Sequence, residues 1–264
     1  MTALAGAVPR RGPIAGLNPV AKLGAALLIA LPLILTIDPV SAAVALVLEI
    51  PLLAAAGLGW REFWVRTLPI WIAAPLAGLT IALYGATSGE VYVEWFVVRI
   101  SEGSISLALA TFFRVLAIAL PAVVLFVTVD PTDLADGLAQ LLRLPARFVL
   151  GALAGMRLLS LLTDDWRALA LARRARGVAD TGQVRRVLGM AFALFVLSIR
   201  RGSTLATAME ARGFGGTGVR TWARESHFGW REWMLLAVGA AISAIAITVA
   251  VATGSWNFIL GGTA

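Results

Sequence analysis

The sequence of 264 residues has no cysteine, a single histidine and a single lysine. Without cysteine it can form neither disulfide bonds nor thiolate metal sites. His227 alone cannot build a multi-histidine metal centre. Lys22 stands between Ala21 and Leu23, whereas the lysine of a Walker A motif is followed by serine or threonine. The chain therefore has no nucleotide site of that kind.

Other catalytic signatures are missing as well. The sequence contains neither a Gly-x-Ser-x-Gly elbow nor a His-Glu-x-x-His pair. Asp164 and Asp165 are adjacent, so on a helix their side chains point about 100° apart and do not face each other as a catalytic carboxylate pair does. We expect no catalytic residue, no metal ligand and no cofactor, and hence a protein that is not an enzyme by itself.

Charged residues are also scarce, at 14% against roughly 25% in an ordinary soluble domain. Hydrophobic residues make up 59% of the chain and the mean hydropathy is +0.88. Several apolar runs approach the ~20 residues that cross a hydrocarbon layer. These features predict an all-α polytopic membrane protein with about five transmembrane helices: Leu17–Ile37, Ser41–Leu58, Leu68–Tyr84, Ile105–Val129 and Trp233–Thr253.

The basic residues that give the net charge of +7 are unevenly distributed. Fifteen of the 22 lie between residues 130 and 232, Arg10 and Arg11 precede the first run, and Arg61 and Arg66 separate the second from the third. Because loops rich in arginine and lysine stay in the cytoplasm, we predict a multi-pass protein of the cell membrane with a cytoplasmic N-terminus and an outside C-terminus. The same distribution argues against nucleic acid as the partner.

The predicted spans divide the chain into three regions. Residues 1–129 form an N-terminal membrane region of about four spans, residues 130–232 a helical cytoplasmic coupling region, and residues 233–264 a last span with a tail. Two charges fall inside spans, where charges indicate function by default. We expect structural roles instead, with Glu49 near the interface and Arg114 paired within the bundle or reaching a polar cavity.

The cytoplasmic region repeats apolar residues at helical spacing. Its first helix starts with Asp130-Pro131-Thr132-Asp133, with Thr132 as the N-cap, and ends at Pro145. Four leucines fall on one face of this helix: Leu134, Leu138, Leu141 and Leu142.

Four further helical segments follow in this region. Two of them are expected to begin after a capping side chain, Thr163 or Ser203, and to end just before a glycine, Gly177 or Gly213. In order, the segments are Arg147–Leu162, Thr163–Arg176, Val187–Ile199 and Ser203–Arg212.

Two of these helices end in the same tripeptide, 36 residues apart. Ala175-Arg176-Gly177 closes ALARRARGVAD (170–180), and Ala211-Arg212-Gly213 lies in LATAMEARGFGG (205–216). One such tripeptide is an ordinary helix end, since arginine complements the macrodipole and glycine suits the position after it. Two at successive cytoplasmic ends indicate docking, because a guanidinium offers a planar fork of donors to a partner.

These motifs resemble the transmembrane T component of energy-coupling factor transporters, the EcfT/CbiQ family. The resemblance covers most of the chain. LNPVAKL (17–23) is similar to the opening of the family's first span, where Asp-Pro-Arg-Thr-Lys is more usual, and DPTDLADGLAQLL (130–142) to its entry into the cytoplasmic segment. LATAMEARGFGG is the most specific match.

The resemblance implies a coupling subunit of a vitamin or metal-ion uptake transporter. In such a complex, ATP-driven motion of two cytoplasmic ABC ATPases passes through the T component to a membrane-embedded S component that binds the substrate. The residues implied to dock the ATPases are Ala175, Arg176, Gly177, Ala211, Arg212 and Gly213. Those implied to contact the S component are Leu134, Leu138, Leu141 and Leu142.

Two alternatives remain open at this point. A membrane scaffold or anchor would use its basic cytoplasmic helices to bind anionic lipid or a partner complex, with about 1 kcal/mol for each surface arginine, so that all arginines would matter alike. A self-sufficient secondary transporter would show inverted repeats and a polar site near the bilayer midplane. Arg114 alone is a poor site of that kind.

Overall fold

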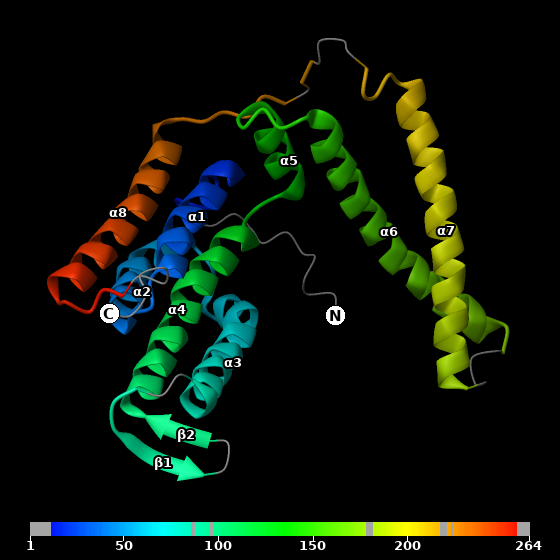
Figure 1. The fold of residues 1–264 in the computed structure, drawn as a ribbon. Coiled ribbons are helices and arrows are strands. Elements are labelled where there is room, and N and C mark those ends of the chain that lie inside the picture. The colour runs from blue at the N-terminus through cyan, green and yellow to red at the C-terminus, as the bar shows by residue number, and fades with distance from the viewer. Residues whose placement is uncertain are drawn as a thin grey trace. The chain divides into compact units, whose positions relative to one another are not determined.

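A computed structural model describes residues 12–85, 88–95, 98–177, 182–216, 221–222 and 224–257. The chain divides into two compact units, Met1–Gly137 with Ser226–Ala264, and Leu138–Glu225. Helices dominate both units (Figure 1). The predicted all-α class is confirmed, with one two-stranded antiparallel hairpin that the sequence did not lead us to expect.

The first unit holds the N-terminal helices and the last one. Its elements are α1 (Pro19–Leu35), α2 (Pro39–Ala55), α3 (Trp60–Tyr84), β1 (Val91–Trp95), β2 (Val98–Ser101), α4 (Glu102–Val127) and α8 (Trp230–Ala252), and α5 (Pro131–Gln140) lies at the boundary between the units. The second unit contains α6 (Ala146–Ala175) and α7 (Gln183–Ala211).

Prolines and capping side chains in the sequence mark where several of the helices begin. Proline occupies the first turn of α1 and α2, where its missing N–H costs nothing. The Asn18 side chain accepts from the Val20 N–H, and the Asp38 carboxylate accepts from the Ser41 N–H. In α5 the cap is Asp130, whose carboxylate accepts from the Thr132 N–H at 2.7 Å. The prediction of Thr132 as N-cap was therefore wrong by two residues, because α5 already begins at Pro131 and Asp130 is the residue immediately before it.

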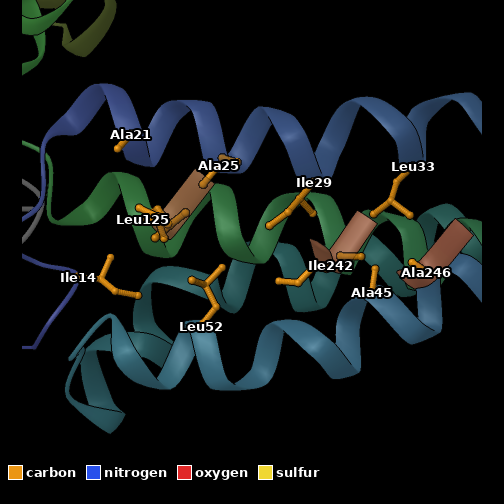
Figure 2. Packing of buried hydrophobic residues seen from close by; sticks show 13 residues of the cluster. Ile14, Ala21, Ala25, Ile29, Leu33, Ala45, Leu52, Leu125, Ile242 and Ala246 are labelled. Carbon is orange, nitrogen blue, oxygen red and sulfur yellow. The ribbon is translucent and has the colours of Figure 1, made fainter. Parts of the chain in front are cut away.

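Small residues hold α1 against α8 in the first unit, whose buried hydrophobic core is shown from close by in Figure 2. Ala25 packs against Gly239, and the Ser243 hydroxyl donates to the Leu28 carbonyl at 2.7 Å. The second contact lies nearer the C-terminus than the first on both helices, so α1 and α8 run parallel. Such close approach through small side chains is typical of helix packing in membranes, where lipid supplies no hydrophobic force between helices.

Several helix ends gather at one end of this unit. The buried Lys22 donates to the Thr128 hydroxyl at 2.8 Å, which joins the start of α1 to the end of α4. Asn18 donates to the Ser226 hydroxyl at 2.8 Å, just before α8 begins. Gly12 lies against Gly57 in the α2–α3 connection. The α2–α3 connection, which Arg61 follows in the first turn of α3, thus lies at the same end as the starts of α1 and α8.

Five described helices are long and apolar enough to cross a membrane: α3, α4, α6, α7 and α8. Three of them, α3, α4 and α8, coincide with predicted spans. The first two predicted spans form helices of 17 residues each, about 25 Å at 1.5 Å per residue. α6 and α7 lie in the segment predicted to be cytoplasmic, so length and composition alone do not separate them from the spans.

The two intramembrane charges differ in their surroundings. Arg114 of α4 donates to the Thr36 carbonyl beside Asp38, so it pairs within the bundle as expected. Glu49 of α2 is fully buried, and neither carboxylate oxygen has a hydrogen-bond partner among the described residues. It shares the inward face of α2 with Ala45 and Leu52, and its expected place near the membrane interface stays a prediction.

Candidate partner-docking site

Both Ala-Arg-Gly motifs end a long helix in the same backbone conformation. Arg176 is the C-cap residue of α6 (φ −87°, ψ 2°) and Arg212 that of α7 (φ −90°, ψ 9°). The following Gly177 and Gly213 have φ of +68° and +74°, which favours glycine over every residue with a side chain. The glycines therefore end the helices sharply and leave each arginine at the tip.

Hydrogen bonds define the two tips. The Gly177 N–H donates to the Arg174 carbonyl at 3.0 Å, and the Gly213 N–H donates to the Glu210 carbonyl at 2.9 Å. At the second tip the Phe214 N–H also donates to the Met209 carbonyl at 2.9 Å, which completes a Schellman motif. The last carbonyls of the helices are thus satisfied locally.

Both motif arginines are exposed. Within the described residues, neither guanidinium makes a hydrogen bond or an ion pair. Beside Arg212, a hollow of about 720 Å³ is lined by Pro145, Ala146 and Arg147 together with residues of the second motif. Five donors on each unpaired guanidinium are consequently available to a partner.

Each long helix is continuous, unlike the prediction. Thr163 lies inside α6, where its hydroxyl donates to the Ser160 carbonyl at 2.7 Å. Ser203 lies inside α7, where its hydroxyl donates to the Arg200 carbonyl at 2.9 Å. Both side chains bond back to their own helix instead of capping a new one, so the two helix breaks predicted at these residues were wrong.

α6 and α7 run antiparallel (Figure 1). A bidentate ion pair joins them. Arg201 of α7 donates through both terminal nitrogens to the Asp165 carboxylate, with the Nη2–Oδ1 contact at 3.1 Å. Asp165 lies eleven residues before Arg176, and Arg201 eleven residues before Arg212. Each tip is therefore about 16 Å from the ion pair along its helix, and the two tips point in opposite directions.

This ion pair is not apparent from the sequence. Asp165 and Arg201 are 36 residues apart, and neither belongs to a recognised motif. A long-range pair of this kind has no sequence signature of its own, because its partners meet only when α7 folds back along α6.

We expect removal of this ion pair to widen the range of angles between α6 and α7. The side chains are 36% and 20% exposed, so the loss of stability should be about 1 kcal/mol. Because the chain has no cysteine, spin labels at Ala175→Cys and Ala211→Cys report the distance between the tips. Asp165→Ala should broaden that distance distribution.

The neighbouring aspartate provides the control for this experiment. Asp164 is 72% exposed and contacts only Arg167 of its own helix, at 3.5 Å, so Asp164→Ala should leave the distribution narrow. Exchange of the partners, Asp165→Arg with Arg201→Asp, should restore it. Equal broadening in both alanine variants would contradict the assigned role.

The leucines predicted to contact a partner lie around α5. Leu134 and Leu138 are half-buried in the helix, Leu141 follows its end, and Leu142 is 53% exposed. The side of α5 that is buried within the protein carries Ala135 and Ala139 instead. The two long helices also expose large apolar side chains: Phe148, Leu159, Leu188, Phe192, Phe195 and Ile199.

A multi-pass helical protein with two exposed arginine tips and uncovered apolar faces is a membrane subunit built to bind other subunits. The chain matches the CbiQ family, described as cobalt transport protein, over residues 11–222. It is 30% identical over 200 residues to the energy-coupling factor transporter transmembrane protein EcfT of Limosilactobacillus fermentum, a match covering 70% of this chain and 73% of that protein.

A second relative covers still more of the sequence. The energy-coupling factor transporter transmembrane protein EcfT of Bacillus selenitireducens is 28% identical over 243 residues, which are 88% of this chain and 90% of that protein. The chain therefore belongs to this family of transmembrane components of energy-coupling factor transporters. The family inferred from the paired motifs is confirmed, and with it a role as the membrane component of a transport complex.

Proposed function

We propose that Arg176 and Arg212 each dock one of two cytoplasmic ABC ATPases, with the flanking alanines and glycines allowing close approach. The observation that carries this proposal is the identical conformation of the two exposed tips, each held open by a glycine with positive φ. Two equivalent tips suit two equivalent partners. ATP is hydrolysed by those partners, and this chain transmits their motion.

Topology supports a cytoplasmic place for both tips. Arg10 and Arg11 precede the first span, Arg61 and Arg66 follow the second, and fifteen of the 22 basic residues lie between residues 130 and 232. Positive residues stay inside, so the N-terminus and the coupling region 130–232 are cytoplasmic, whereas residues 1–129 and the final span cross the membrane. Under this assignment α6 and α7 lie at the cytoplasmic surface despite their apolar faces.

The apolar faces of α6 and α7 bind a second partner. The leucines around α5 and the exposed aromatic and aliphatic side chains of α6 and α7 bind a membrane-embedded S component, which carries a vitamin or a metal ion. Large exposed apolar patches generally mark surfaces that bind another protein or a membrane. A change in the angle between α6 and α7 then moves the S component and releases its substrate inward.

Cross-linking tests the docking directly, because the chain has no native cysteine. Ala175→Cys and Ala211→Cys place one thiol at each exposed tip, and a reagent joining cysteine to lysine should link each variant to a co-expressed ATPase subunit. Ala252→Cys, at the far end of α8, should give no such product. Absence of a product from both tip variants would refute the docking assignment.

A further inference from the structure

An apolar groove of about 440 Å³ lies between α2, α3 and α4 of the first unit. Leu46, Ile50 and Leu53 of α2 and Leu120 of α4 line one part of it. Trp60, Phe63 and Trp71 of α3 line the rest. In a protein surrounded by lipid, a groove of this composition is suited to an acyl chain.

Polar groups occur at two levels of this groove. Trp60 and Arg61 precede the apolar run that begins at Leu68, so they lie at the level of the lipid headgroups. Trp71 lies one turn inside that run, and its ring packs 5.5 Å from the Trp64 ring, toward the headgroup side. The Trp71 Nε1 donor is buried and has no hydrogen-bond partner in the described part of the chain. A buried unpaired donor at the depth of the ester groups matches the carbonyl of a glycerolipid.

The mouth of the groove is positively charged. Arg61 is exposed and makes no ion pair within the described part of the chain. Glu62, the acidic residue of the same turn, is engaged by Arg66 at 2.9 Å. α3 has no side-chain cap, so no side chain covers its first N–H groups, and its positive dipole end favours an anion near Trp60 and Arg61. Together these groups match a phosphate.

The start of α8 can be compared with the start of α3, because both helices begin with the same four residues. Gly-Trp-Arg-Glu begins α3 at residues 59–62 and begins α8 at residues 229–232. At α8 the Glu232 carboxylate accepts from the Gly229 N–H at 2.9 Å and from the Asn18 N–H, and so covers the start of that helix. At α3 the equivalent Glu62 turns to Arg66 instead. In the same four-residue sequence, the glutamate therefore covers the N-terminus of α8 but leaves the N-terminus of α3 uncovered, beside the groove.

We propose that this groove binds one anionic phospholipid, with an acyl chain along α2 and α3, an ester carbonyl on Trp71 and the phosphate on Arg61. Positive charge at headgroup level favours an anionic over a zwitterionic lipid. The site lies on the lipid-facing side of the first unit and is independent of ATPase docking.

Titration of the purified full-length chain with defined lipids tests this proposal. Native mass spectrometry measures the binding of dioleoyl phosphatidylglycerol and of dioleoyl phosphatidylcholine. The wild type should bind its first molecule of phosphatidylglycerol more tightly than its first molecule of phosphatidylcholine. Arg61→Gln should weaken phosphatidylglycerol binding about tenfold, and Trp71→Phe should weaken both lipids.

The matched control is Arg231→Gln, at the same position of the repeated tetrapeptide on α8, and it should leave both affinities unchanged. Leu53→Trp, which fills the groove, should lower both, and Trp71→Phe keeps the test decisive if that variant fails to fold. Equal affinities of the wild type for the two lipids, equal behaviour of Arg61→Gln and Arg231→Gln, or a bound polypeptide in place of lipid would overturn the proposal.

Discussion

Reversal of both motif arginines, Arg176→Glu with Arg212→Glu, is expected to abolish substrate uptake by the assembled transporter. A hydrogen bond to a charged group contributes about 1.5–3 kcal/mol, so loss of two such contacts weakens coupling by two to four orders of magnitude. Each glutamate also repels the acidic groups that an arginine binds. Uptake in cells and co-purification of the ATPases measure the effect.

Other arginines of the second unit provide the control. Arg185 and Arg186 lie in the first turn of α7, far along the helix from Arg212. Their reversal to glutamate removes the same charge from the same unit, so uptake should change little. If the loss of uptake were equal for the two double variants, general attraction to anionic lipid would explain the data better than docking at the tips.

Insertion of a large side chain between α1 and α8 is expected to unfold the first unit. A Cβ atom at Gly239 would lie 3.0 Å from the Ala25 carbonyl oxygen and 3.2 Å from the Ala25 Cα. Both neighbours are helix backbone and cannot rotate away, so Gly239→Leu forces the helices apart. We expect a loss of about 3 kcal/mol or more, seen as a lower melting temperature and aggregation in detergent.

Gly155 of α6 is the matched control, because a Cβ there meets nothing within 4 Å. Gly155→Leu should leave the melting temperature unchanged or raise it, since leucine is a better helix former than glycine. Ser243→Ala, which removes one interhelical hydrogen bond, should cost only about 0.6 kcal/mol. A stable Gly239→Leu variant would mean that α1 and α8 do not pack as described.

The sequence predicted the class of fold and the motif positions well, for a physical reason. Apolar runs of span length and glycine after arginine at a helix end are local signals, and each is fixed by a few neighbouring residues. Helix continuity was harder to predict, since Thr163 and Ser203 can either cap a helix or bond back to their own carbonyls. That choice depends on packing over the whole length of α6 and α7.

Long-range features could not be predicted from local pattern. The Asp165–Arg201 pair, the burial of Glu49 and the groove beside Trp71 all join residues from different helices. The hairpin of β1 and β2 was hidden because the short connection between two spans was treated as a loop. The repeated Gly-Trp-Arg-Glu was visible in the sequence, but its two different uses appear only in three dimensions.

The position of the Asp165–Arg201 pair has a mechanical consequence. The ion pair lies eleven residues from each motif arginine, so forces of equal size applied at right angles to the two helices at their tips exert torques of equal size about it. When the two torques have opposite sense, they change the angle between α6 and α7 without turning the two helices as a whole. Arms of unequal length would leave a net torque that also rotates the pair.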